Sequence, residues 1–439
     1  MNKKIVIDKG PLLWKKAKKI IPGGNMLLSK RSEMFLPNLW PSYFMKTKGC
    51  HVWDLDNNKF TDMSIMGIGT NTLGYSNSAV DSAVLNAVKL GNMSSLNCPE
   101  EVELAERLIE INPWAGMVKY ARSGGEANAI SIRIARAASG KDNVAFCGYH
   151  GWHDWYLASN IADKDSLSSH LLDGLETSGV PANLKGTSFP FNYNDYDGLL
   201  NLVDNKNIGV IKMEVQRNNP PKDDFLEKVR KLATEKGIVL IFDECTSGFR
   251  ETFGGLHQKY QVEPDIAMFG KTLGNGYAIT AVVGRSEVME SAQSSFISST
   301  FWTERIGPTA ALETLKEMKK LKSWDIITKI GHQVRKGWQE IADNNNLDIQ
   351  ISGIPAISIF GFSSKNNLAY KTLITQEMLK KGFLASNSLY ACIDHEKFLP
   401  EYLEKLNDVF KLIQECEDGN PVQDLLDSEI CHSGFQRLN

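Results

Sequence analysis

Short apolar runs alternate with amphipathic segments through the middle of the chain. The clearest unit begins with the apolar run IGVIKMEV (208–215) and ends with a second run, IVLIFDE (238–244). Between these runs, apolar residues recur at helical spacing, at Phe225, Leu226, Val229, Leu232 and Ala233. Gly237 follows, a residue typical of the position at which a helix ends. The pattern predicts a strand–helix–strand unit, the building block of a parallel sheet.

Further strands are predicted from β-branched and apolar runs at 144–147, 266–269 and 280–283. Nearer the N-terminus, WDLDNNKFTDM (53–63) has the pattern of a β-hairpin. After about residue 310 the pattern changes to long helices such as TAALETLKEMKKL, followed by weaker strands around 349–361 and a helix near 401–415.

These patterns predict an α/β protein with a large domain built on a mostly parallel central sheet and a smaller C-terminal α/β domain. We expect the large domain at 66–315 and the small domain at 316–439. The first segment, 1–65, is expected to pack on both domains.

Composition narrows the class of protein. The 439 residues are 42% hydrophobic and 23% charged, the proportions of a globular protein and not of a disordered chain. With 49 basic and 52 acidic residues the formal charge is −3, which offers no basic surface for nucleic acid or an anionic membrane. The seven cysteines are scattered, which indicates reduced thiols. Neither a signal peptide nor a membrane-length apolar run is recognisable, so we expect a cytoplasmic protein.

Two charged residues follow apolar strands, where ligands of open α/β sheets bind. Asp243 ends the run IVLIFDE, and a carboxylate buried there needs a cationic partner to stay ionised. An ordinary helix-capping or ion-paired acid is an equally simple interpretation.

Lys271 follows IAMFG and is flanked by glycines that supply little bulk. Desolvation lowers the pKa of a lysine and frees its amine for Schiff-base chemistry, although a lone lysine in a loop is more often simply exposed.

Two further segments have the character of a ligand site. Ser123, Gly124 and Gly125 open a predicted helix, where backbone N–H groups and the helix dipole attract an anion such as phosphate. The segment lacks the Walker and Rossmann patterns, and a plain N-cap remains an alternative.

The aromatic-rich segment CGYHGWHDWY (147–156) follows a predicted strand. Tyr149 or His150 could stack on a planar heteroaromatic ring. His150, His153 and Asp154 are also metal-ligating residue types, but no further ligand follows at suitable spacing, so we expect no metal ion.

Together, an aldehyde-trapping lysine, a strand-end aspartate, a phosphate-binding helix start and a stacking aromatic residue are what pyridoxal phosphate requires. The segments that carry them resemble the class III aminotransferases of pyridoxal phosphate fold type I, and among these the glutamate-1-semialdehyde aminomutase branch most closely. The resemblance runs from about residue 35 to 315. It rests on IFDECTSGFR (241–250), GGLHQKYQVEPDIAMFGKTLGNGYAITAVVGR (254–285), RSGGEANAISIRIAR and GYHGWH.

The resemblance implies a role for each site residue. Lys271 forms the internal aldimine, Asp243 pairs with the pyridinium nitrogen, and Tyr149 stacks on the ring beside His150. The phosphate and the substrate side of the cofactor are assigned by resemblance to Ser123, Gly124, Gly125, Glu214 and Thr300. Thr300 reaches the phosphate across a dimer interface, so the resemblance also implies a homodimer with shared active sites.

The chain departs from the family at several positions. Val215 stands where proline is usual, Gly125 replaces a hydroxyl residue, and ERIGP (304–308) replaces a frequent Gly-Asn-Pro turn. Arg31 falls about one position from the arginine that binds the substrate carboxylate in the aminomutases. After Arg305 the chain contains only Arg335 and Arg437, so no carboxylate fork is assigned. A keto sugar or another carbonyl substrate without a carboxylate stays open.

We therefore expect a pyridoxal-phosphate-dependent aminotransferase acting on a small-molecule amino donor and a carbonyl acceptor. Lys271 would serve as both nucleophile and general acid/base. The alternative is an intramolecular aminomutase, an isomerase that keeps the nitrogen in one molecule, favoured by the opening PGG (22–24) and by GGLHQKY (254–260). A non-catalytic protein that retains the fold is a third possibility, which the intact pair of Lys271 and Asp243 disfavours.

Overall fold

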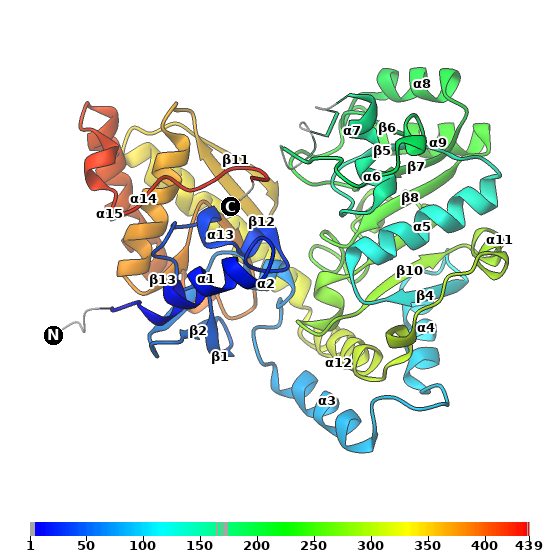
Figure 1. Cartoon of the computed structure of the whole chain (residues 1–439), viewed down its shortest axis with the longest axis horizontal. Coiled ribbons are helices and arrows are strands. Elements are labelled where there is room, and N and C mark those ends of the chain that lie inside the picture. Colours follow the sequence, from blue (N-terminus) through cyan, green and yellow to red (C-terminus); the bar gives the residue numbers. More distant parts are fainter. Residues whose placement is uncertain (1–4, 164–165, 168–169, 171–173, 437, 439) are drawn as a thin grey trace. The chain divides into compact units, whose positions relative to one another are not determined.

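The computed structural model describes residues 5–163, 166–167, 170, 174–436 and 438. The chain forms two compact units (Figure 1). One comprises Ser78–Asp325, and the other combines Met1–Asn77 with Ile326–Asn439. The first 77 residues thus share a unit with the C-terminal part of the chain.

A seven-stranded sheet forms the centre of the unit Ser78–Asp325. Its strand order is β4-β10-β9-β8-β7-β5-β6. The strands are β4 (Met117–Ala121), β10 (Thr280–Gly284), β9 (Ile266–Phe269), β8 (Val239–Glu244), β7 (Ile208–Met213), β5 (Asn143–Cys147) and β6 (Ser188–Pro190). β10 runs antiparallel to both of its neighbours, and the pairs from β9 to β6 are parallel. The predicted mostly parallel sheet is confirmed.

The strand–helix–strand unit is also confirmed, as β7, α9 (Phe225–Lys236) and β8. Every residue of β7, β8, β9 and β10 is buried, which explains why these strands are continuous apolar runs without alternation. The long helix α5 (Gly124–Ser139) crosses one face and contacts all four strands (Figure 1). The other helices of this unit include α3 (Ser78–Leu90), α4 (Glu100–Ile111), α8 (Tyr196–Asn205), α11 (Ser286–Met289) and α12 (Ile306–Leu321).

An apolar cluster between α5 and the sheet identifies the strand residues that point towards this helix. Ile130 and Ile134 of α5 belong to one apolar cluster with Val210, Ile241, Met268 and Val282 of the strands. Because side chains alternate along a strand, Lys212 in β7 and Asp243 in β8 lie on this same face. This placement becomes important at the candidate site.

The other unit contains two smaller sheets. One has the order β1-β2-β3-β13 and the other β11-β12-β14. Their strands are β1 (Phe44–Lys48), β2 (His51–Asp54), β3 (Lys59–Met63), β13 (Phe383–Ala385), β11 (Ile349–Ile354), β12 (Ile357–Phe362) and β14 (Ser388–Tyr390). The predicted hairpin is confirmed as β2 and β3, and its turn is held by Asp54 Oδ1, which accepts hydrogen bonds from the amides of Asp56 and Asn58.

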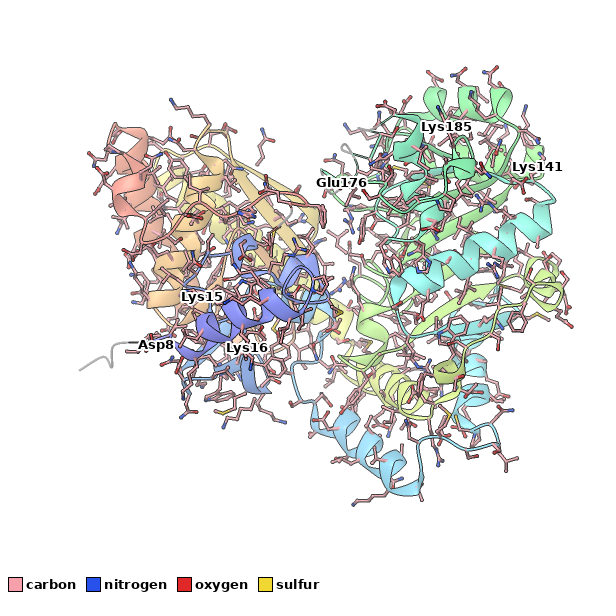
Figure 2. The ribbon with its side chains drawn as sticks, in the orientation of Figure 1. Asp8, Lys15, Lys16, Lys141, Glu176 and Lys185 are labelled. Atoms are coloured by element: carbon pink, nitrogen blue, oxygen red, sulfur yellow. The ribbon has the colours of Figure 1, made fainter. Side chains whose placement is uncertain are left out.

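Several helices accompany these sheets. They include α1 (Lys9–Ile20), α13 (Ser323–Asn344), α14 (Asn367–Lys380) and α15 (Leu399–Glu417). Among them, α14 is buried on most of its sides. In α1, Trp14 and Ala17 are buried whereas Lys15 and Lys16 are exposed, and Figure 2 shows both lysines on the outside of the helix. In the described part of the chain, no helix is both long enough and apolar enough to span a membrane.

Gly237 allows a direct test of the helix end that the sequence predicts. Its φ of 63° is left-handed, and a Cβ added there would meet nothing within 4 Å. Gly237→Ala should therefore lower the free energy of unfolding by about 1 kcal/mol through backbone conformation alone, as urea denaturation would measure. Gly237→Asn, which tolerates this conformation, is the matched control and should cost less. Equal stability of Gly237→Ala and the wild type would contradict this account.

Candidate active site

The carboxyl ends of four adjacent parallel strands meet at one edge of the large sheet. β5 leads into Gly148, β7 into Glu214, β8 ends at Glu244, and β9 leads through Gly270 into Lys271. The pairing of Asp243 with Met268 and of Glu244 with Phe269 places the ends of β8 and β9 side by side. The structure thus brings together most of the residues that the sequence singled out.

Asp243 is buried, with 4% of its surface exposed, and it has partners on both carboxylate oxygens. Oδ2 lies 2.8 Å from His150 Nδ1, and Oδ1 accepts a hydrogen bond of 3.1 Å from the Cys245 amide. Burial alone would raise the pKa of this carboxyl, but the His150 hydrogen bond and the charge of Lys212 outweigh it and hold the pKa well below its usual value. Asp243 is therefore an ionised carboxylate. The sequence analysis predicted that it needs a cationic partner but did not identify one.

His150 is completely buried and bridges the ends of β5 and β8. Its Nε2 lies 3.0 Å from the Cys147 carbonyl oxygen, opposite the contact with Asp243. The carbonyl oxygen and the carboxylate are both hydrogen-bond acceptors, and each faces one nitrogen of the ring. This side chain is therefore engaged with Asp243, and the described residues contain no group of three or more His, Cys, Asp or Glu side chains that could hold a metal ion.

Lys212 is a member of the site that the sequence analysis missed. This lysine in β7 is fully buried, and its Nζ donates to Ser131 Oγ at 3.0 Å and lies 2.9 Å from Met268 Sδ. Burial lowers its pKa to about 8, against the opposing attraction of Asp243. The available signal was a charged residue within the apolar run IGVIKMEV, because a lysine is almost never fully buried without a partner.

Lys271 follows β9 and Gly270 in the chain. Its Nζ donates a hydrogen bond of 2.6 Å to Thr246 Oγ1. Burial, and next the positive charge of Arg217, lower the pKa of this amine to about 8. Its φ of 35° lies in the left-handed region, a backbone conformation that is uncommon for residues other than glycine and is found at functional sites.

The predicted phosphate cradle lies at the start of α5. Ser123 caps the helix: its Oγ accepts from the Glu126 amide, and Glu126 Oε2 accepts from the Ser123 amide at 2.9 Å. This capping box leaves the first-turn amides of Gly124 and Gly125 without a partner inside the helix. A Cβ added at Gly124 would lie 4.0 Å from Cys245 Sγ, so this turn opens beside the end of β8. Its N–H groups and dipole suit a phosphate there.

Gly125 is constrained by the neighbouring loop. A Cβ at this position would lie 3.1 Å from His153 Cδ2 and 3.2 Å from Trp152 Nε1. The hydroxyl residue usual in the family is thus replaced by a glycine against which the aromatic loop packs.

Tyr149 and Glu214 follow the ends of the neighbouring strands β5 and β7. The Tyr149 amide donates to Glu214 Oε2 at 3.4 Å, and burial raises the pKa of the Tyr149 phenol. Gly148, at φ 109°, permits this approach, because a Cβ there would come within 2.6 Å of the same carboxylate oxygen. Glu214 also forms an ion pair with Arg217, whose Nε lies 2.9 Å from Oε2. The sequence analysis missed Arg217, although it follows a strand-end glutamate by three residues.

The remaining candidates lie in separate places. Thr300 is exposed at the start of the 3-10 turn Thr300–Thr303, which Trp302 ties to α5 through a hydrogen bond from Nε1 to Glu126 Oε1. Its role across a dimer interface stays a prediction. Arg31 donates to the Gln436 carbonyl at 2.9 Å, and Arg335 donates to Ser358 Oγ at 2.7 Å, both within the other compact unit. Arg437 lies outside the described residues.

The observed chemistry fits an aldehyde cofactor with an aromatic nitrogen and a phosphate. An amine of lowered pKa, a buried ionised carboxylate and free helix amides are grouped along two adjacent strand ends and the start of one helix. These are the complementary groups for a carbonyl carbon, a ring N–H and an anion respectively.

The lowered pKa of Lys271 predicts its reactivity. Below pH 8 the amine is protonated, and above it the amine is neutral and nucleophilic, so capture of a small aldehyde, trapped by borohydride and located by mass spectrometry, should rise with pH and level off above about pH 8. Exposed Lys259, measured in the same digest, is the comparison lysine. A Lys271 profile identical to that of Lys259 would refute the assignment.

Comparison with known proteins finds relatives over most of the chain. Residues 38–394 match the family model described as aminotransferase class-III. The chain is 32% identical over 386 residues to a 3-aminobutyryl-CoA aminotransferase of Cloacimonas acidaminovorans, covering 86% of this chain and 89% of that protein. It is 33% identical over 402 residues to a glutamate-1-semialdehyde 2,1-aminomutase of Methanobrevibacter smithii, covering 87% and 92%.

Solved structures share the fold. The FumI protein of Sphingopyxis sp. MTA144, in its PLP internal aldimine form, superposes with a TM-score of 0.84 at 22% identity, covering 95% of this chain and 99% of that one. An omega-transaminase from Sphaerobacter thermophilus superposes with a TM-score of 0.80 at 22% identity, covering 94% and 98%.

Proposed function

The chain belongs to the class III aminotransferases, and from this membership we propose that it moves an amino group from a small-molecule donor to a carbonyl acceptor at the strand ends around Lys271. The fold is that of the pyridoxal-phosphate-dependent transaminases of fold type I, as the sequence predicted. The observation that carries the proposal is the hydrogen-bonded amine of Lys271, with its lowered pKa, at the same sheet edge as the buried, ionised Asp243.

Pyridoxal phosphate is the cofactor, and the residues that would hold it follow from the site. Lys271 would bond to its aldehyde, Asp243 would accept a hydrogen bond from its protonated ring nitrogen, and the amides of Gly124 and Gly125 at the capped start of α5 would bind its phosphate. Tyr149 would lie against the ring. When bound, this cofactor supplies an aldehyde that condenses with amines and a protonated ring that withdraws electrons from the carbon being deprotonated.

The protein's own residues hold, transfer and position protons in the proposed reaction. Asp243 can hold a proton on the ring nitrogen because His150 and Lys212 keep its carboxylate ionised and oriented. Lys271 can take a proton from the substrate carbon and return it, since an amine with a pKa of about 8 exchanges protons readily near neutral pH. Thr246 Oγ1 fixes the position of that amine.

A second candidate is an intramolecular aminomutase, which the similarity to the aminomutase of Methanobrevibacter smithii supports. An aminomutase would use the same Lys271 and Asp243 but would keep the nitrogen within one molecule. The fate of the nitrogen therefore distinguishes the two reactions.

The purified holoenzyme should transfer ¹⁵N from a labelled amino donor to an unlabelled carbonyl acceptor, as mass spectrometry of the product would show. Lys271→Ala should remove the borohydride-reducible yellow chromophore and lower turnover by about 10³-fold or more, because nucleophile and proton carrier are lost together. Lys259→Ala, a change of the same kind at an exposed lysine, should leave both intact. Full turnover by Lys271→Ala would sink the mechanism, and product free of ¹⁵N would favour the aminomutase.

We further propose that the enzyme acts as a homodimer whose sites are shared. Exposed apolar side chains gather on two segments of the Ser78–Asp325 unit, at Leu85, Val88, Leu90, Met93, Leu96, Phe296 and Phe301. Hydrogen bonds from the Arg305 amide to Asn92 and from Thr303 Oγ1 to Met93 Sδ hold these segments together. An exposed apolar surface next to Thr300 suits a second copy of the chain, and Thr300 of the partner subunit would then reach the phosphate.

Hybrid dimers test this sharing. If each site combines Lys271 of one subunit with Thr300 of the other, refolding Lys271→Ala together with Thr300→Val creates hybrids that carry one wild-type site. The mixture should regain about a quarter of wild-type turnover, the fraction expected for random pairing in a twofold dimer. Activity no greater than the mean of the two variants would show that each subunit's site is self-contained.

A further inference from the structure

A small cavity opens where β5 and β7 end. Its volume is about 240 Å³, and its lining includes Gly148, His170, Tyr193, Glu214 and Arg217. Gly148 and Glu214 belong to the candidate active site, because Glu214 accepts a hydrogen bond from the Tyr149 amide. The cavity is therefore an extension of that site along the sheet edge, on the side of β7 and β5.

The charges in this cavity are few. Among the described residues that line it, Arg217 is the only permanently charged cation. Burial lowers the pKa of His170 to about 4, so this imidazole is neutral near pH 7. Glu214 is the one carboxylate among the lining residues that the structure describes, and it is paired with Arg217 through contacts of 3.0 and 2.9 Å from Nε to its two oxygens.

Arg217 is more accessible than its partner. Its side chain is 20% exposed, whereas that of Glu214 is 7% exposed. After burial, the charge of Arg217 is the largest influence that lowers the pKa of Lys271, so the guanidinium acts electrostatically on the reacting amine. The cation therefore lines the cavity next to the strand ends that carry the candidate active site.

Resting on the proposed function, we infer that Arg217 recognises a carboxylate on the substrate and that Glu214 is its counterion when no substrate is bound. The substrate class is then a short amino acid and its keto or aldehyde acid, not a neutral amine or a keto sugar. A guanidinium suits this role because its planar donors bind a carboxylate through paired hydrogen bonds. No bond is made or broken in this step, since the incoming carboxylate only replaces or shares Glu214.

Glu214, as the counterion, stabilises the charge of Arg217 in the empty cavity. An unpaired guanidinium in a partly buried cavity costs desolvation free energy, which Glu214 offsets in the empty enzyme. A substrate carboxylate must compete with Glu214, which predicts opposite effects for the two variants. Removing Arg217 should weaken carboxylate binding, and neutralising Glu214 should strengthen it. A pair that served only stability would give two similarly weakened proteins.

The test measures binding to the holoenzyme by calorimetry and by the change in cofactor absorbance. The probes are butyrate, its uncharged analogue butanamide, and inorganic phosphate. The wild type should bind butyrate at least 10-fold more tightly than butanamide. Arg217→Met should lose about 10- to 100-fold in butyrate affinity without a change for butanamide, the range expected for a charge-assisted hydrogen bond. Arg217→Lys should retain part of the preference, and Glu214→Gln should bind butyrate more tightly than the wild type.

Three outcomes would overturn the inference: unchanged butyrate affinity in Arg217→Met, no preference of the wild type for butyrate over butanamide, or preferential binding of phosphate in this cavity. Thermal unfolding and the yellow chromophore of Arg217→Met report whether the variant is folded and loaded. The proposed function is judged separately, because a wild type that lacks the Lys271-dependent chromophore or ¹⁵N transfer fails that proposal whatever the carboxylate preference.

Discussion

The site depends on keeping one carboxylate ionised inside the protein. Asp243 is buried at the end of β8, where desolvation favours its neutral form. His150 and Lys212, both fully buried, supply the opposing interactions. An ionised Asp243 can hold a proton on the cofactor's ring nitrogen, whereas a neutral one could not. The proposed role of Asp243 thus rests on its hydrogen bond with His150 and on the charge of Lys212.

Parallel strand topology explains why so few residues suffice. Adjacent strands β9, β8, β7 and β5 all end at one edge, so Lys271, Asp243, Glu214 and the Gly148–His150 segment meet without long-range loops. The start of α5 reaches the same edge at Gly124, near Cys245. A rigid, fully buried sheet therefore positions an amine, a carboxylate and an anion-binding helix end relative to one another.

Lys212, which is fully buried, and Lys271, which is partly exposed, show how surroundings give one residue type different roles. Both have pKa values lowered to about 8, chiefly by burial. Lys212 is enclosed by Ser131 and Met268 beneath Asp243, where it can act only through its charge. Lys271 is held by Thr246 in the loop beyond β9, where it is available to a ligand.

Local sequence determined the strands, α9 with its glycine end, the capped start of α5, and the placement of Asp243 and Lys271 at strand ends. These features depend on near neighbours in the chain, through periodicity, capping and strand length, so a single sequence reveals them. The contact of the Tyr149 amide with Glu214 and the support of Asp243 by Lys212 and His150 were decided by tertiary structure alone. They depend on which strands are neighbours and which side chains share a sheet face. The sequence could not specify these relations, because residues such as His150 and Asp243, 93 positions apart, meet only after the sheet has formed.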